Sequence, residues 1–140
     1  MERQVYISAA KRTSMGGFKG SLSAKTAPEL GGAAIKGVLD DKLEIKPHID
    51  EVIMGCVLPA GLGQAPARQA GFQAGLSDCI PATTINKMCG SGMKAVMLGY
   101  DQIRAGDTHL IVAGGMESMT NAPYLTSNMR SGARLGHQEI

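Results

Sequence analysis

Cysteine chemistry is the strongest functional signal in the sequence, and it lies in the segment Asn86–Ala95 (NKMCGSGMKA). A cysteine thiolate is a strong nucleophile, and a cysteine that precedes a helix faces unpaired backbone N–H groups and the positive end of the helix dipole. Both features favour the thiolate. Gly90 and Gly92 have no Cβ atoms, so a substrate carbonyl can approach the backbone closely. This combination predicts nucleophilic catalysis by Cys89.

The same segment has two other interpretations, which the residues alone leave open. Free cysteines are usually buried, so Cys89 can also be a small apolar side chain beneath a helix. Gly90–Ala95 fits the dinucleotide-binding pattern G-x-G-x-x-A. That pattern has an acidic residue about 20 positions further on, at the end of the next strand. Here Asp107 precedes that strand and Glu117 follows its turn, so the spacing favours a nucleophile over a nucleotide site.

The other two cysteines are predicted to be structural. Cys56 lies inside an apolar stretch, and Cys79 lies in a loop that glycines do not shape as they do around Cys89. The sequence has no C-x-x-C pair, and no histidine lies near a cysteine at zinc-finger spacing, so we expect no metal site. The three cysteines cannot all pair, and for a chain in a reducing compartment we expect all three to be free thiols.

The histidines and the basic residues of the first loop are weaker candidates. No histidine is predicted to lie near Cys89, so we expect no cysteine–histidine pair within this chain; the histidines are His48, His109 and His137. Three cations in the first loop can meet a phosphate, although a solvated loop is the simpler interpretation; they are Lys11, Arg12 and Lys19.

The elements that position these residues follow from apolar patterning. Four apolar or β-branched runs predict strands, at Gln4–Ala9, Asp50–Leu58, Ala82–Met88 and His109–Ala113. Three runs between them predict helices, at Thr26–Asp41, Gln64–Gly75 and Met93–Arg104. The order βαβαβαβ predicts an α/β fold with a mostly parallel sheet and helices on both faces. Ligands bind at the carboxyl ends of such strands, and Cys89 follows the third strand.

Local signals define the ends of these helices. Thr26 and Glu29 fit a capping box at the start of the first helix, and Gly106 ends the third. The third helix carries no charge between Ala95 and Tyr100, which predicts that it is buried on most of its sides.

Length and composition exclude several classes of protein. The chain has 140 residues, of which 44% are hydrophobic, and a net charge of +2. It is therefore too apolar for a disordered chain and too weakly basic for a dedicated nucleic-acid binder. No window approaches 18 uninterrupted apolar residues, so we expect no membrane span. The run Val5–Ala10 is too short for a signal-peptide core, and we therefore expect a cytoplasmic location.

The segment Asn86–Val96 (NKMCGSGMKAV) closely resembles the nucleophile segment of the thiolases, and most of all their acetyl-CoA acetyltransferase (acetoacetyl-CoA thiolase) branch. The similarity covers essentially the whole chain and keeps the family order of segments. Further matching segments are Val5–Gly20, Asp50–Pro59, Gly63–Gln69 and Ala113–Met119.

This resemblance implies a reaction and its participants. Cys89 matches the family nucleophile, which takes an acetyl group from acetyl-CoA as a thioester and passes it to a second acetyl-CoA to give acetoacetyl-CoA. The backbone N–H of Cys89 would belong to an oxyanion hole. Coenzyme A thioesters are substrates, no covalently bound cofactor is implied, and the residues that hold coenzyme A are not identified. Complete family members form homo-oligomers, either dimers or tetramers.

The resemblance also implies that the chain corresponds to about the first third of a thiolase. Residues 1–119 match the N-terminal α/β domain without its last strand, and residues 120–140 match the start of a loop region. The family's C-terminal half supplies a second cysteine and a histidine. We therefore expect a fragment, or a chain completed by another, that is inactive alone. The alternative is a non-enzymatic assembly piece that needs a partner chain.

Overall fold

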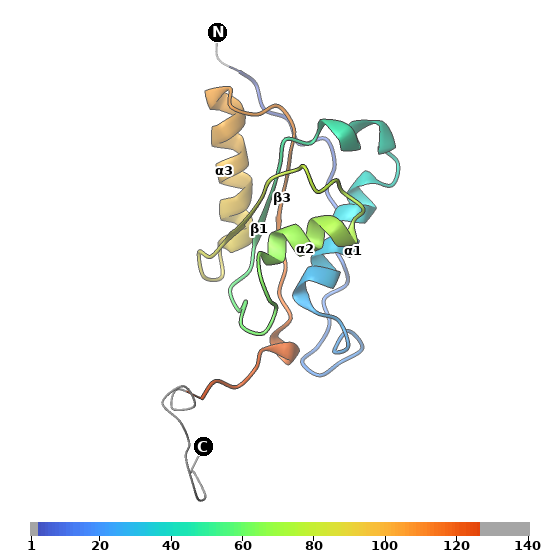
Figure 1. The fold of residues 1–140 in the computed structure, drawn as a ribbon, viewed down its shortest axis with the longest axis vertical. Coiled ribbons are helices and arrows are strands. Elements are labelled where there is room, and N and C mark those ends of the chain that lie inside the picture. Colours follow the sequence, from blue (N-terminus) through green and yellow to red (C-terminus); the bar gives the residue numbers. More distant parts are fainter. Residues whose placement is uncertain (1–2, 127–140) are drawn as a thin grey trace, which may run out of the picture.

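Three parallel strands form the centre of the molecule in the computed structural model, which describes residues 3–126 (Figure 1). They are β1 (Glu51–Gly55), β2 (Ala82–Ile85) and β3 (Ile111–Gly115), in the order β2-β1-β3. The central strand β1 is buried from its second residue onward, which explains its continuous apolar sequence. The predicted α/β class and parallel sheet are therefore confirmed.

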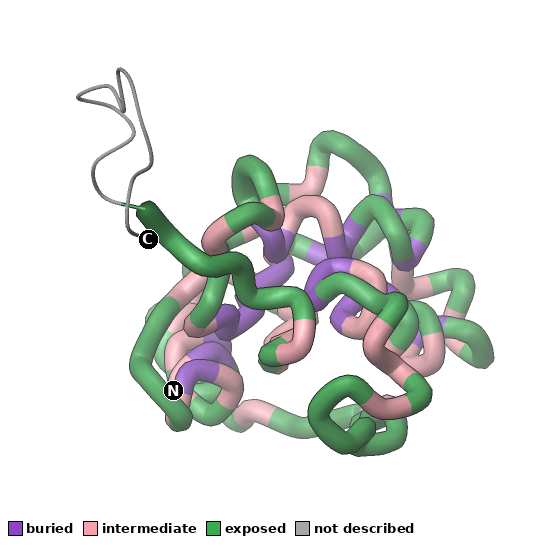
Figure 2. Tube along the Cα trace, turned by 90° about the horizontal axis from the view of Figure 1, so that it is seen from below, coloured by how far each residue is buried: buried purple, intermediate pink, exposed green. Residues whose placement is uncertain are grey.

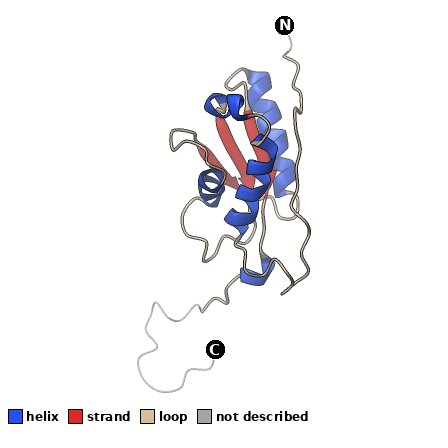
Figure 3. Ribbon diagram, turned by 90° about the vertical axis from the view of Figure 1, so that its right-hand side faces the viewer, coloured by secondary structure: helices blue, strands red, loops and turns tan. Residues whose placement is uncertain are grey.

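Helices cover both faces of this sheet (Figures 1 and 3). The α-helices are α1 (Ala27–Leu39), α2 (Pro66–Gln73) and α3 (Ser91–Ala105), and two 3-10 helices are η1 (Leu43–His48) and η2 (Met119–Asn121). The crossovers β1-α2-β2 and β2-α3-β3 run in opposite directions along the sheet. Because such crossovers are right-handed, they place α2 and α3 on opposite faces. The first helix packs against α2.

The main apolar core lies between the sheet and the α1–α2 pair. It includes Ile35 and Leu39 of α1, Val52 and Met54 of β1, and Ala70 of α2. Figure 2 shows the buried residues gathered at the centre and exposed loops around them. Ile53, between Val52 and Met54, is also buried, as expected for a strand with helices on both sides.

The capping box at the start of α1 is present as predicted. The Glu29 carboxylate accepts the Thr26 N–H at 2.8 Å, and the Thr26 hydroxyl accepts the Glu29 N–H at 3.4 Å. The bond from the Thr26 N–H lowers the pKa of Glu29, as does the Thr26 hydroxyl, which donates to the same carboxylate at 3.0 Å. Pro28 has no N–H, so three N–H groups at the start of α1 have no partner within the helix, and the capping box pairs two of them, those of Thr26 and Glu29.

The predicted first strand at Gln4–Ala9 is wrong. These residues form no strand, and the side chains of Tyr6 and Ile7 are exposed. Arg3 lies against Gly106 at the end of α3, and Lys11 lies near Gly37 of α1. The segment is therefore extended without a paired edge among the described residues, and β-propensity alone does not form a strand without a neighbour to pack against.

The other strands are shorter than predicted or shifted. The Asp50 carboxylate accepts the N–H groups of His109 (2.6 Å) and Leu110 (3.0 Å), so the ladder of β3 begins only at Ile111. At its other end β3 continues through Gly115, which pairs with Gly55. The predicted loop region, residues 120–140, lies mostly outside the described residues. The predicted boundary between it and the α/β domain, after residue 119, falls within η2.

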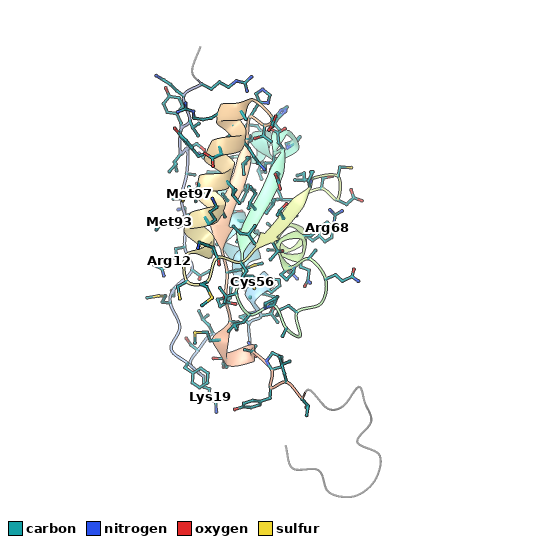
Figure 4. All side chains as sticks on the ribbon, turned by 90° about the vertical axis from the view of Figure 1, so that its left-hand side faces the viewer. Arg12, Lys19, Cys56, Arg68, Met93 and Met97 are labelled. Atoms are coloured by element: carbon teal, nitrogen blue, oxygen red, sulfur yellow. The ribbon has the colours of Figure 1, made fainter. Side chains whose placement is uncertain are left out.

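The predicted burial of α3 on most of its sides is also wrong. The helix buries only its small residues, Ser91, Ala95 and Gly99, against the sheet. Met93 is 73% exposed and Met97 52% exposed, and both project from the helix in Figure 4. An uncharged stretch is compatible with burial but does not show which side of the helix is buried. Here the side with small residues fits closely onto the sheet, so that side packs.

No helix among the described residues is long and apolar enough to cross a membrane.

Candidate active site

The carboxyl ends of the three strands meet at one edge of the sheet. Gly55 pairs with both Ile85 and Gly115, so the strands end level with one another. The segments that follow them, residues 56–58, 86–90 and 116–118, therefore lie at the same edge. In parallel α/β sheets this edge is where ligands bind.

Cys89 lies at this edge, in the turn between β2 and α3. Its thiol is exposed. The Gly90 N–H donates to the Lys87 carbonyl at 3.0 Å and closes the turn. Helix α3 begins at Ser91, with Gly90 as its N-cap residue. The structure therefore places Cys89 between a strand end and a helix N-terminus, where the sequence predicted it.

Close backbone contact brings α3 onto the sheet directly behind this turn. A Cβ atom added at Gly55 would lie 2.5 Å from the Ser91 Cβ, and one at Gly115 would lie 3.0 Å from the Gly92 Cα. The first distance is too short for a real side chain, and the second is tighter than most real contacts. Packing against the helix start thus requires glycine at position 55 and favours it at position 115.

The glycine pattern Gly90–Ala95 has no acidic partner of the dinucleotide-binding kind. Glu117 is the acidic residue after β3, but its carboxylate accepts the N–H groups of Val57 at 2.8 Å and Leu58 at 3.1 Å. Gly92 packs against the end of β3. Gly92 therefore serves helix–sheet packing, and Glu117 holds the segment that follows β1.

Glu117 is a residue whose role at this edge the sequence did not reveal. It lies 60 positions from Val57, so no local pattern connects the two residues. The only sequence signal was its position after the strand-ending pair Gly114–Gly115, which a parallel-sheet prediction places at the same edge as Cys89.

Cys56 follows β1 and is buried, with only 1% of its surface exposed. Its Sγ lies 3.6 Å from Glu117 Oε1. Burial, together with the nearby Glu117 charge, raises the pKa of the Cys56 thiol to about 11. The nucleophilic form of cysteine is the thiolate, so Cys56 is a structural thiol, in agreement with the prediction from its apolar surroundings.

Cys79 is exposed but lies at the opposite edge of the sheet. It falls in the loop between α2 and β2, three residues before β2 begins. Its Sγ lies 3.6 Å from Asp78 Oδ1. The chain therefore contains two exposed thiols in different environments, and only Cys89 adjoins the start of a helix.

The two histidines that the structure describes lie away from Cys89. His48 ends η1 just before β1, and His109 precedes β3, so both lie at the amino edge of the sheet. His109 Nδ1 lies 3.9 Å from Asp50 Oδ2. His137 falls outside the described residues. Within residues 3–126 no cysteine–histidine pair forms around Cys89, and no group of three His, Cys, Asp or Glu side chains could hold a metal ion.

The cations of the first loop do not converge on this edge. Lys11, Arg12 and Lys19 are exposed, and Figure 4 shows Arg12 and Lys19 well apart along the chain. The Lys19 ammonium lies 5.7 Å from the centre of the Phe18 ring. This arrangement fits a solvated loop and not a phosphate cradle.

Comparison with known proteins yields one family and many relatives. The chain matches the family described as "Thiolase, N-terminal domain" over residues 5–140. It is 53% identical over 138 residues to the acetyl-CoA acetyltransferase of Saccharomyces pastorianus, covering 97% of this chain and 35% of that protein. It is 51% identical to the acetyl-CoA acetyltransferase of Pseudomonas aeruginosa, covering 99% and 35%.

A third relative is named with a location. The chain is 49% identical to the "Acetyl-CoA acetyltransferase ERG10, cytosolic" of Gibberella zeae, covering 97% of this chain and 34% of that protein. The chain thus spans about a third of the length of the curated relatives that it matches.

Proposed function

The chain belongs to the thiolase family, and from this membership we propose that it supplies the nucleophile of an acetyl-CoA acetyltransferase. Cys89 is the residue that carries the acyl group. The substrates are acetyl-CoA and acetoacetyl-CoA, and coenzyme A thioesters enter as reactants with no covalently bound cofactor. The relatives, each named an acetyl-CoA acetyltransferase, support this substrate class.

In the first half of the reaction the Cys89 sulfur attacks the thioester carbonyl of acetyl-CoA. The tetrahedral intermediate carries a negative oxygen, which the Cys89 backbone N–H would stabilise as part of an oxyanion hole. Its collapse breaks the bond from the carbonyl carbon to the coenzyme A sulfur. The acetyl group is then a thioester on Cys89, and coenzyme A leaves as its thiol after taking up a proton.

In the second half a base removes an α-proton from a second acetyl-CoA. The resulting carbanion attacks the acetyl carbonyl on Cys89 and forms the new carbon–carbon bond. The bond to the Cys89 sulfur breaks, which releases acetoacetyl-CoA and regenerates the thiolate. The reverse sequence is thiolytic cleavage. None of the described side chains is assigned as the α-proton base.

One observation carries the proposal: the exposed Cys89 thiol lies at the carboxyl edge of a parallel sheet, immediately before the N-terminus of the 15-residue helix α3. The unpaired N–H groups of a helix start favour a negative charge. The other exposed thiol, Cys79, lies in a loop at the opposite edge, so the same chain contains its own reference thiol.

We expect iodoacetamide near neutral pH to alkylate Cys89 at least about tenfold faster than Cys79 in the folded chain, because the N–H groups at a helix start stabilise negative charge, whereas Cys79 lies in a loop beside the Asp78 carboxylate. Mass spectrometry of proteolytic peptides measures the two rates separately. In urea the two rates should become equal, since both thiols are then solvated. Equal rates in the folded chain, with circular dichroism confirming folding, would contradict an activated nucleophile.

The 140-residue polypeptide alone is expected to have no thiolase turnover. The family resemblance implies that the α-proton base and most of the coenzyme A pocket are supplied by segments that these residues do not contain. An acetoacetyl-CoA thiolysis assay measures the rate, with a full-length relative as the positive control and Cys89→Ser as the blank. Activity within about tenfold of the full-length enzyme, a loss of less than about 1.4 kcal/mol in transition-state stabilisation, would overturn this expectation.

A second candidate function is assembly with a partner chain, and the exposed apolar side of α3 favours it. Met93, Val96, Met97 and Tyr100 are each more than 40% exposed. Contiguous exposed apolar surface often marks an interface. We propose likewise that the complete enzyme is a homo-oligomer, either a dimer or a tetramer. Sedimentation as a single monomeric species would argue against obligatory assembly.

The domain division and location are also proposals. We assign residues 1–119 to the N-terminal α/β domain and residues 120–140 to the start of a loop region, as the family order suggests. A cytoplasmic location is supported by the name of the Gibberella zeae relative, which includes the word "cytosolic". Fluorescence microscopy of a tagged full-length protein tests the location.

A further inference from the structure

The residue before Cys89 has an unusual backbone conformation. Met88 has a φ of 50°, in the left-handed region. An L-residue with a side chain costs about 1–2 kcal/mol there, and glycine or asparagine is the usual occupant. The Met88 side chain is 71% exposed, so burial of that side chain does not compensate for the strain. Other contacts must hold the turn in this conformation.

The Ser91 hydroxyl makes two of these contacts. It donates to the Met88 carbonyl at 2.6 Å and accepts the Lys87 N–H at 2.8 Å. Ser91 itself is buried, with 4% of its surface exposed, and it packs against Gly55 of the central strand. The hydroxyl therefore connects the N–H of Lys87 and the carbonyl of Met88 to a side chain that packs on the sheet. Two backbone bonds close the same turn, because the Ser91 N–H also donates to the Met88 carbonyl at 3.2 Å and the Gly90 N–H donates to the Lys87 carbonyl at 3.0 Å.

The Asn86 side chain makes the third side-chain contact with this turn. Its Oδ1 accepts the Met88 N–H at 3.0 Å, and its Nδ2 donates to the Val57 carbonyl at 3.3 Å. The Val57 N–H in turn donates to Glu117. The amide of Asn86 is thus oriented from one side by the turn and from the other by the segment that Glu117 holds.

We propose that Ser91 and Asn86 are positioning residues that hold Met88 in the left-handed conformation and thereby fix the backbone from which the Cys89 thiol projects. This inference rests on the proposed function of Cys89 and adds which side chains prepare it. A left-handed Met88 turns the chain sharply between Lys87 and Cys89, so a relaxed Met88 would redirect the thiol. Neither positioning residue touches the substrate in this scheme.

The first experiment replaces the two residues in the 140-residue chain. Ser91→Ala removes both hydroxyl bonds, and we expect the rate of Cys89 alkylation by iodoacetamide to fall about tenfold. Asn86→Leu removes the acceptor and should also slow alkylation, whereas Asn86→Asp keeps it and should slow alkylation less. Ser118→Ala is the matched control, because its hydroxyl also donates to a backbone carbonyl, that of Lys25 at 2.8 Å.

The second experiment separates positioning from a merely structural role. Glycine adopts the left-handed conformation without strain, so Met88→Gly should restore Cys89 reactivity to within about twofold of wild type in the Ser91→Ala background. It cannot replace the lost partner of the Lys87 N–H, so the thermal stability should stay lowered. The positioning role would be overturned if Met88→Gly restored both Cys89 reactivity and thermal stability, or if it restored neither.

A conformational measurement keeps this inference distinct from the function of Cys89. The one-bond Cα–Hα coupling of Met88, measured by NMR, reports its φ directly. We expect the left-handed signature in wild type and in Ser118→Ala, and its loss in Ser91→Ala. If folded Ser91→Ala keeps the left-handed coupling value at Met88, the inference is overturned. If wild-type Cys89 is alkylated slowly although Met88 has the left-handed coupling value, only the proposed function is overturned. If Ser91→Ala fails to fold, the Met88 coupling is measured in Asn86→Leu and Asn86→Asp instead, and the same outcomes apply.

Discussion

At the residue scale, the environment of each cysteine determines its chemistry. Cys56 and Cys89 both follow a strand at the carboxyl edge of the sheet. Cys56 is buried beside the Glu117 carboxylate, which disfavours its thiolate. Cys89 is exposed beside the start of α3. The same residue type at the same edge therefore serves packing in one case and, in the function that we propose, nucleophilic attack in the other.

The raised pKa of Cys56 predicts a loss of stability at alkaline pH. In the unfolded chain the thiol ionises around its ordinary pKa of 9.0, whereas in the folded chain it keeps its proton to about 11. The free energy that this group contributes is therefore complete below about pH 9 and is lost as the pH rises toward 11.

Urea unfolding across this pH range measures that loss. Between about pH 8 and pH 10.5 the wild type should lose on the order of 1–2 kcal/mol more than Cys56→Ala, which has no thiol to ionise. Parallel stability curves for the two proteins would contradict a thiol that folding keeps protonated.

At the element scale, glycines set the distance between α3 and the sheet. Gly55 and Gly115 lie at paired positions on adjacent strands, and both face the first turn of α3. The close approach buries Ser91 and Ala95 and fixes the start of the helix behind Cys89. The fold therefore uses small residues, and not large apolar ones, where the helix packs against the site.

Gly55→Ala tests this close approach. The new Cβ would lie 2.5 Å from Ser91 Cβ and 2.7 Å from the Gly92 nitrogen, so the helix start must move. We expect a loss of about 2–3 kcal/mol in unfolding free energy together with slower alkylation of Cys89.

Gly114→Ala is the matched control for this substitution. It lies on the next strand, and its new Cβ would lie 3.4 Å from the flexible Met54 Sδ, so it should cost about 1 kcal/mol or less. Equal losses for the two variants, measured by urea denaturation, would contradict the packing argument.

At the scale of the whole molecule, the two faces of the sheet differ in how they are covered. The face under α1 and α2 forms the main core. On the other face α3 packs by its small residues and leaves Met93, Val96, Met97 and Tyr100 exposed. An apolar helix face on the solvent side predicts self-association or binding of apolar probes by this chain.

We expect the double substitution Met93→Gln and Met97→Gln to lower binding of an apolar dye by about half or more while changing the unfolding free energy by less than about 0.5 kcal/mol. Dye fluorescence and urea denaturation measure the two quantities. Ala95→Gln is the control on the inner side of the same helix; because Ala95 is fully buried, this change should destabilise by about 2 kcal/mol or more. Loss of stability in the double variant would contradict an outward face.

The sequence by itself determined the features that depend on neighbouring residues. The capping box of Thr26 and Glu29, the end of α3 at Gly106 and the strand–cysteine–glycine–helix order around Cys89 each involve groups a few positions apart. Such groups meet whenever the local backbone forms, so their pattern is visible in the letters. The alternation of apolar runs likewise indicated the parallel α/β class.

Only the tertiary structure decided which distant groups meet. The bonds from Glu117 to the segment after β1 span about 60 positions, and the side of α3 that packs depends on glycines in two other elements. The run Gln4–Ala9 has strand-forming residues but no paired edge within residues 3–126. Pairing and close packing require a partner surface, and a partner far along the chain leaves no local pattern from which it could be predicted.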